Sequence, residues 1–400
     1  MKSSYTSMKD AFTFNRRSFM KISGAIGGGL LLGNPTAWAE ENARKEPPAT
    51  NVNDVLEVAR KKHSLPGYAP GKVVEIHDHD VITDKIVNPD IVVKMLEKSI
   101  TTLTGMDMKK SFAELFNVDD IVGIKVNPVG PRVISVHLEL VDAVIDWLEK
   151  NGVARKNIII WDRFDYMLTD GGFTKERYPG IGIVGLQTMD ESAYMGEAED
   201  DSGWLDENGV HLSMNNFDQS TYYWADVEGP KEKPYLNQHV VNGKYSYFGK
   251  LLTQKLTKII NIAAFKNTGN GISMATKNMG YGSICNTGRL HRPLFFNVCT
   301  EVLAFPCIRD KMVLNITDAL VGQYDGGPMG DAKFTYEKKS IFAATDPFAL
   351  DMICHNQMVQ KRKEMGVRVN EHPRYTEYLR YAEKLGLGIA NPENIDYVKI

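Results

Sequence analysis

The chain has 400 residues, of which 43% are hydrophobic and 10% are aromatic, and its formal net charge is −3. This is an ordinary globular composition, with enough apolar residues for a sizeable core. The slight excess of acidic residues argues against nucleic acid as a partner, because phosphate backbones are bound by basic surfaces.

The N-terminus carries the pattern of an export signal. Arg16 and Arg17 precede a short apolar run, ISGAIGGGLLLG. This arrangement resembles a twin-arginine signal peptide, although Asn15 stands where the usual pattern has Ser or Thr. The small residues in Ala37-Trp38-Ala39 predict that signal peptidase removes residues 1–39.

The predicted export bears on location, charge and partners. Removal of residues 1–39 takes away five Lys or Arg residues and one Asp, which moves the net charge from −3 to −7. Twin-arginine export carries folded proteins, commonly with a metal or organic cofactor, so the sequence predicts a periplasmic protein and favours a cofactor of unspecified identity. The twin-arginine machinery and signal peptidase are the expected partners. No segment of the mature chain is apolar enough to span a membrane.

The first predicted elements follow a polar linker over residues 40–51 and open a single α/β domain over residues 52–400. Alternation of apolar and polar residues predicts a strand over residues 71–82. A helix is expected over residues 88–105, with Asn88 as its N-cap, proline at the first helical position and glycine at its end.

The clearest unit is strand, helix, strand. Residues 119–127 and 156–163 are short apolar runs typical of buried strands. Between them, residues 135–152 repeat apolar side chains at helical spacing and end at a glycine. Short connections between these elements predict a βαβ unit with parallel strands and a right-handed crossover.

An acidic excursion is expected as an insertion at about residues 178–235. Residues 178–230 hold no Lys or Arg, and residues 189–209 hold eight Asp or Glu residues. Their spacing does not match an EF-hand loop, so a solvated acidic surface is favoured over a calcium site. The aromatic run Tyr222–Trp224 is either a packed strand, which we favour, or a ring-stacking surface.

The second half of the chain repeats the alternation of strands and helices. The sequence predicts strands over residues 258–266, 311–320 and 341–344, helices over 292–305, 347–358 and 373–388, and an edge strand over 396–400. Asp346 is the expected N-cap of the second helix. Together the elements predict an open, mostly parallel sheet with flanking helices.

Polar side chains end four of the predicted buried strands, and they are the main functional signal. These residues are Lys125 and Asn127, Asp162 and Arg163, Lys266 and Asn267, and Thr317 and Asp318. Ligands of open α/β sheets bind outside the carboxyl ends of the strands, so we expect these side chains to converge. Ordinary loop polarity is the alternative explanation. It accounts poorly for a cation directly after a buried strand, because such a charge lies near desolvated backbone and needs an anionic partner.

The stretch NIAAFKNTGNGISMATKNMG, residues 261–280, adds glycines to this edge. We interpret it as a strand that runs into a glycine loop, in which Gly269, Gly271 and Gly280 let backbone N–H groups approach a ligand. Lys266, Lys277, Arg289 and His291 would add positive charge around such a cradle for a small anion. No P-loop and no G-x-G-x-x-G fingerprint is present. A second glycine-rich loop, GQYDGGPMGD at residues 322–331, either folds over the same edge or is an ordinary turn.

Metal and disulfide chemistry find weaker support. His77 and His79 would share one face of a strand and could hold a first-row metal if a third ligand came from elsewhere; a plain surface strand is the alternative. The four cysteines, Cys285, Cys299, Cys307 and Cys354, contain no C-x-x-C pair, so no iron–sulfur motif is visible. Their disulfide state stays open.

Several blocks of the chain resemble the family called domain of unknown function 362. They are VGIKVN, NIIIWDR, INIAAFKNTGNGISMATKNMG, RLHRP, ITDALVGQYDGGP, FAATDPFALD and YAEKLGLG, in an order that covers roughly residues 70–400. The resemblance implies functional polar positions at Lys125, Asn127, Asp162, Lys266, Lys277, Asn278, His291, Asp318, Asp346 and Asp351. Some relatives carry ferredoxin-like segments, which this chain lacks.

Three functions are compatible with these observations. The first is an enzyme acting on a small anionic molecule, with Lys266 and Lys277 as electrostatic stabilisers, His291 as acid or base and Asp318 as orienter or metal ligand. In that hypothesis the substrate is bound by Lys125, Asn127, Asp162, Asn278 and Arg289. The alternatives are a non-catalytic protein that holds a metal or redox cofactor, and a solute-binding module.

Overall fold

The computed structural model describes residues 47–187, 216–227, 243–291 and 293–400. They belong to one unit, Pro47–Ile400. The predicted signal peptide, the start of the linker and the eight acidic residues of the segment 189–209 lie outside the described residues. Within the described part of the chain, no helix is both long and apolar enough to cross a membrane.

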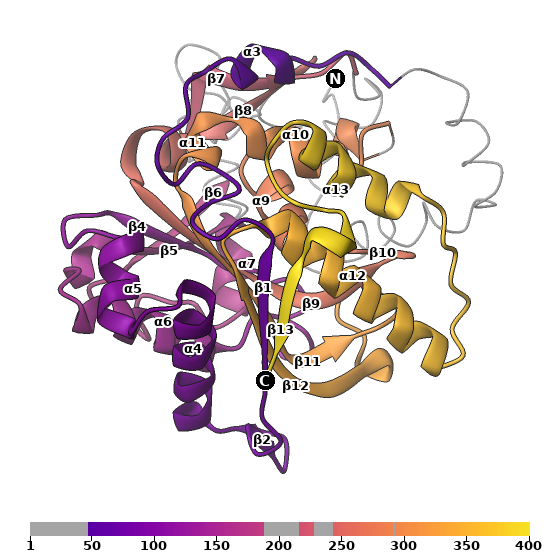
Figure 1. The fold of residues 1–400 in the computed structure, drawn as a ribbon. Coiled ribbons are helices and arrows are strands. Elements are labelled where there is room, and N and C mark those ends of the chain that lie inside the picture. The colour runs from indigo at the N-terminus through magenta and orange to yellow at the C-terminus, as the bar shows by residue number, and fades with distance from the viewer. Residues whose placement is uncertain (1–46, 188–215, 228–242, 292) are drawn as a thin grey trace, which may run out of the picture. The chain divides into compact units, whose positions relative to one another are not determined.

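A nine-stranded sheet runs through the middle of this unit (Figure 1). Its order is β13 (Asp396–Lys399), β1 (Lys72–His77), β12 (Thr335–Ala344), β11 (Met312–Gln323), β9 (Lys258–Thr268), β4 (Val122–Lys125), β5 (Ile158–Phe164) and β6 (Gly182–Gln187), with the short β10 (Gly271–Ile272) paired to β9. The predicted α/β fold with a mostly parallel sheet is confirmed.

One long strand breaks the parallel order. β12 pairs antiparallel with both β11 and β1, whereas the other neighbours along the main path are parallel. The connection between β11 and β12 spans residues 324–334, which is too short for the crossover that a parallel pair needs. β12 is also longer than the predicted strand over residues 341–344.

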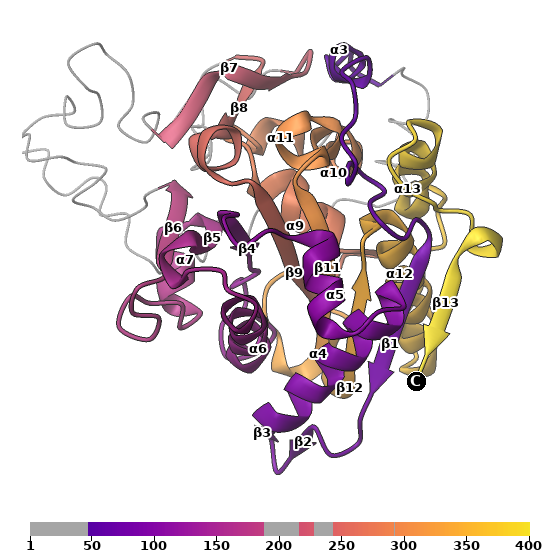
Figure 2. The same cartoon turned by 60° about the vertical axis from the view of Figure 1, so that its left-hand side comes forward.

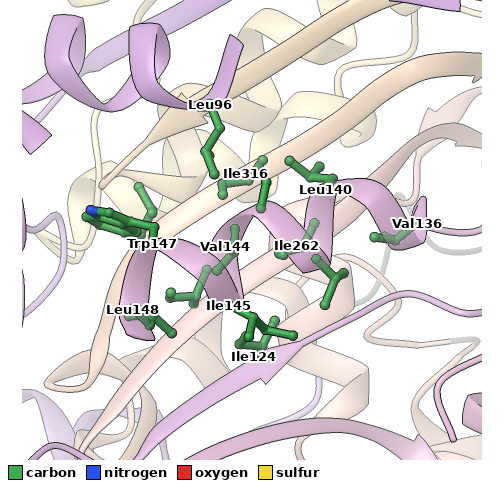
Figure 3. Packing of buried hydrophobic residues seen from close by; sticks show 14 of the residues in the cluster. Leu96, Ile124, Val136, Leu140, Val144, Ile145, Trp147, Leu148, Ile262 and Ile316 are labelled. Carbon is green, nitrogen blue, oxygen red and sulfur yellow. The ribbon is translucent and has the colours of Figure 1, made fainter. Parts of the chain in front are cut away.

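One face of the sheet is covered by α4 (Pro89–Thr104), α5 (Met108–Leu115) and α6 (Leu138–Lys150), as Figure 2 shows. The predicted caps of α4 are present: Asn88 Oδ1 accepts from Asp90 and Ile91 N–H groups, and Gly105 adopts φ +72°. The βαβ unit β4-α6-β5 is confirmed. Its helix packs Leu140 and Val144 against strand residues that include Ile262 (Figure 3).

The other face is covered by α9 (Ala275–Gly282), α10 (Val298–Glu301), α12 (Pro347–Glu364) and α13 (Arg374–Lys384). The prediction of one continuous helix over residues 292–305 is wrong. After α10 the chain forms a 3₁₀ turn, Val302–Ala304, and α11 follows over Pro306–Arg309. Phe305 is extended at ψ 136° because the residue before a proline disfavours the helical conformation.

Two short strand pairs and several small helices lie outside the main sheet. β7 (Phe217–Trp224) and β8 (Tyr245–Gly249) form a separate two-stranded sheet, and β2 (Ile82–Thr83) pairs with β3 (Ile86–Val87). Tyr223 is fully buried, as expected for a packed strand. The small helices include α3 (Val52–Leu56), α7 (Asp165–Asp170) and the π-helical turn Leu251–Lys255.

Candidate functional site

β4, β5 and β9 are adjacent and parallel, and β9 continues past the ends of the other two strands: Lys125 pairs in register with Asn261, and Lys266 lies further along β9. They bring Lys125, Asp162 and Lys266 to one edge of the sheet, as the sequence predicts. Helix α9 adds Lys277 from the neighbouring face. We call Lys125, Lys266 and Lys277, together with the single carboxylate of Asp162, the lysine cluster.

Lys125 is almost completely buried, with 1% of its side chain exposed, and it is fully hydrogen bonded. Its Nζ donates to the Val126 carbonyl oxygen at 2.7 Å and to Asn278 Oδ1 at 2.8 Å, and it forms an ion pair with Asp162. Burial lowers the pKa of Lys125, and the Asp162 charge opposes that shift. The three N–H groups of a charged ammonium therefore all have acceptors.

Lys266 has different partners. Its Nζ donates to Asn127 Oδ1 at 2.9 Å and to the Val129 carbonyl oxygen at 2.8 Å, and it forms no ion pair with any described Asp or Glu residue. The side chain is fully buried. Burial, followed by the positive charge of Lys277, lowers the pKa of Lys266 to about 7.

Lys277 lies on helix α9 and not in a flexible glycine loop, which corrects the sequence interpretation. Its Nζ is 5.3 Å from the ring centre of Phe295 and 5.7 Å from that of Tyr281, and 3.5 Å from Ser273 Oγ. Aromatic ring faces attract a cation. Burial lowers the pKa of Lys277. No carboxylate of the described residues forms an ion pair with it.

A chain of buried asparagines extends from Lys125 into the sheet. Asn278 Nδ2 donates to Asn261 Oδ1 at 2.8 Å, and Asn261 Nδ2 donates to Asn315 Oδ1 at 2.9 Å. Asn315 in turn donates to the Thr345 carbonyl oxygen at 3.1 Å. Asn261 and Asn315 are not among the site residues that the sequence predicts. A polar residue within an otherwise apolar strand was the available signal, because a buried amide requires partners.

Helix α9 is held in place by Asp351 of α12. The Asp351 carboxylate accepts from the N–H groups of Ala275 and Thr276, each at 2.9 Å. Two glycines of α9 allow close packing: a Cβ at Gly282 would lie 2.6 Å from Lys125 Cε, and one at Gly280 would lie 2.9 Å from Cys299 Cα. Gly280 therefore makes room for the neighbouring helix α10. This packing differs from the predicted backbone cradle for a ligand.

The second glycine-rich loop does fold over the same edge. The Gly327 N–H group donates to Asn267 Oδ1 at 3.0 Å, and Gln323 pairs in register with Lys266. Arg362 of α12 fastens this loop to the turn after β9: its guanidinium donates to the carbonyl oxygens of Tyr324 at 2.9 Å and Gly269 at 3.2 Å. Arg362 is not among the site residues that the sequence predicts.

His291 shares the surroundings of Lys277. Its ring centre is 4.5 Å from that of Tyr281 and 5.7 Å from that of Phe295, and its Nδ1 is 2.8 Å from the Thr287 carbonyl oxygen. Burial and the Lys277 charge lower the pKa of His291 to about 3. The imidazole is therefore neutral at neutral pH. A neutral imidazole has a single N–H group, and the Thr287 carbonyl oxygen can only accept a hydrogen bond. The ring proton is therefore on Nδ1.

Asp318 and Arg289 are engaged elsewhere. Asp318 accepts from the backbone N–H group of His137 at 2.7 Å and contacts His137 Nδ1 at 2.9 Å. Burial would lower the pKa of His137, but the Asp318 charge outweighs this and raises it. Arg289 donates to the carbonyl oxygens of Ala225 and Val227, which follow β7, and to Ser246 Oγ of β8. It therefore binds the β7-β8 strand pair and not the lysine cluster.

The histidine pair of the sequence prediction lies apart from the lysine cluster. β1 ends at His77, and residues 78–81 form a turn stabilised by Asp78 Oδ1, which accepts from Asp80 N–H at 2.8 Å. The rings of His77 and His79 are 4.6 Å apart and perpendicular. The described residues contain no group of three His, Cys, Asp or Glu residues that could hold a metal. All four cysteines are free thiols.

A family model described as Domain of unknown function (DUF362) matches residues 196–356. The match supports the resemblance that the sequence blocks indicate, over less than half of the chain. It includes Lys266, Lys277 and His291, whereas Lys125 and Asp162 precede it. No curated protein and no solved structure matches the chain.

Proposed function

We propose that the protein is an enzyme that binds a small anionic molecule at the lysine cluster. The observation that carries the proposal is the charge of the cluster: it holds three lysines and one carboxylate, and that carboxylate, Asp162, is already paired with Lys125. Uncompensated buried charge is costly, and an anionic ligand would offset that cost.

The surrounding residues suit such a ligand. Asn127 and Asn278 orient two of the lysines, and Tyr281 and Phe295 form an apolar wall beside Lys277. Low-dielectric surroundings strengthen the attraction between an anion and Lys277. His291 lies next to the same rings and is the candidate for proton transfer. Burial and the Lys277 charge lower the pKa of this imidazole, and an anion bound at Lys277 would offset that charge.

Binding is tested by thermal unfolding of the mature protein with succinate as the probe. We expect succinate to raise the Tm, because a ligand that binds only the folded state stabilises it. Lys277→Met should weaken succinate binding by roughly 10- to 100-fold, since a charged hydrogen bond contributes about 1.5–3 kcal/mol.

Lys110→Met is the matched control for this experiment, because its side chain is 74% exposed and lies on α5. It should bind succinate like the unmodified protein. Equal affinities for Lys277→Met and Lys110→Met would contradict the proposed site. Binding of small carboxylates without turnover of any of them would favour the solute-binding alternative over an enzyme.

We also propose that the protein is exported to the periplasm by the twin-arginine pathway. The proposal rests on Arg16 and Arg17, the short apolar run that follows and the small residues before position 40.

A further inference from the structure

The hydrogen bonds of the two strand-end lysines differ in number. A protonated lysine has three N–H donors and no acceptor, whereas the neutral amine has two donors and one lone pair. Lys125 donates to three oxygens, one of them a carboxylate, which fits the charged form. Lys266 donates to two oxygens of the described residues, and both belong to neutral groups.

The surroundings of Lys266 also favour its neutral form. The side chain is fully buried, and Lys277 and Lys125 both oppose a further positive charge at this position. Asp162, the carboxylate of the cluster, is bound to Lys125. A desolvated lysine beside other cations is the arrangement in which the amine becomes a nucleophile at neutral pH.

We infer that Lys266 is a nucleophilic amine that forms an imine with a small 2-oxo acid, whose carboxylate is bound by Lys277. This inference rests on the proposed function, because it places the anionic group of the ligand at the lysine cluster. A 2-oxo acid matches the two features of the site, an amine with a free lone pair and a neighbouring cation.

The reaction balances without an oxidant or reductant. The Nζ lone pair attacks the carbonyl carbon, and the carbonyl oxygen becomes a hydroxyl group as it takes up a proton. The C–O bond then breaks, and the oxygen leaves as water with the two hydrogens that the amine has lost. The imine nitrogen then takes up one proton from water, and this N–H group can still donate to Asn127 Oδ1 or to the Val129 carbonyl oxygen.

Reductive trapping tests the inference. The mature protein is incubated with pyruvate and sodium cyanoborohydride at pH 7, and the modified lysines are identified by peptide mass spectrometry. We expect Lys266 to be labelled at least about 10-fold faster than the exposed Lys110, because a lysine of ordinary pKa near 10.4 is almost entirely protonated at pH 7. Lys266→Arg should remove the fast label.

A second measurement uses the unmodified protein, so it does not depend on whether Lys266→Arg folds. In protein labelled with ¹³C at lysine Cε, one resonance should titrate well below the others, and pyruvate should shift it. Labelling in proportion to exposure, or a Lys266 resonance that titrates with the surface lysines, would overturn the inference. If succinate still raises the Tm in that case, the anion site stands and the imine alone is refuted; loss of both results refutes both proposals.

Discussion

Lys125 and Lys266 stand at the ends of adjacent parallel strands, yet their surroundings give them different chemistry. Lys125 is paired with Asp162, whereas Lys266 contacts an amide oxygen and a backbone carbonyl oxygen. Asp318 and Arg289 show the same principle, because each is bound by partners outside the cluster. At the residue scale, the partners of a charged group decide its role.

Lys125→Met is expected to destabilise the protein by about 3–5 kcal/mol, because it leaves Asp162 buried without its cation. Urea unfolding of the variant and the unmodified protein measures this difference in free energy. Addition of Asp162→Asn to Lys125→Met should recover part of the loss, since the unpaired charge is then absent.

The exposed ion pair of Arg177 and Asp142 supplies the control. Both of its side chains are 42% exposed, and the N–O distance is 2.6 Å. Arg177→Gln should cost less than about 1 kcal/mol, as solvent-exposed pairs do. A similar loss of unfolding free energy for Arg177→Gln and Lys125→Met would show that the buried ion pair stabilises the protein no more than the exposed one.

At the scale of elements, Glu75 joins four segments of the fold. Its carboxylate, on β1, contacts Lys338 and Ser340 of β12, Gln357 of α12 and Tyr397 of β13. Burial alone would raise the pKa of Glu75, but the Lys338 charge and these hydrogen bonds lower it to about 2. These contacts of Glu75 fix the C-terminal strand β13 to the sheet.

The stability supplied by Glu75 should depend on pH. Its folded pKa of about 2 lies below the ordinary value of 4.5, so the contribution is complete above pH 4.5 and is lost as the pH falls towards 2. The difference in unfolding free energy between the unmodified protein and Glu75→Gln should therefore shrink by about 3 kcal/mol over this range.

Urea unfolding at pH 6 and at pH 3 checks this expectation. Tyr397→Phe, which removes one of the hydrogen-bond donors to Glu75, should show a smaller change of the same sign. Parallel stability curves for the unmodified protein and Glu75→Gln would contradict the assigned pKa.

Predictions for elements succeeded where local signals were strong. Asn88 and Asp346 each cap the helix that follows them, because their side-chain oxygens reach N–H groups two or three residues ahead. The predicted helix over residues 292–305 is replaced by α10 and a 3₁₀ turn, and Phe305 is extended because Pro306 follows it; the apolar residues of this run fill a core formed with distant segments. The spacing of apolar residues alone does not distinguish the helices that form from the one over residues 292–305 that does not.

For the whole molecule, the candidate site combines residues that are far apart in the chain. Lys125 and Asp162 come from the first βαβ unit, and Lys266 and Lys277 come from the segment matched by the family model. The lysine cluster therefore depends on the pairing of β4 with β9. The predicted export signal, in contrast, is carried by one short continuous segment.

Replacement of both Arg16 and Arg17 by Lys should keep the protein inside the cell with residues 1–39 attached, because the export machinery recognises the arginine pair. Cell fractionation with mass spectrometry of the N-terminus measures location and cleavage. Lys9→Gln, which changes a charge outside the pair, should be exported and cleaved normally. Equal amounts of processed periplasmic protein in all three cases would rule out the twin-arginine route.

The sequence alone determined the α/β class, the βαβ unit and the presence of lysines at strand ends, because burial of parallel strands leaves a local record in apolar runs that stop at polar residues. Only the tertiary structure decided which charges meet. It paired Asp162 with Lys125, left Lys266 with neutral oxygens, and directed Asp318 to His137. Such choices depend on distances between segments far apart in the chain, and local periodicity does not encode them.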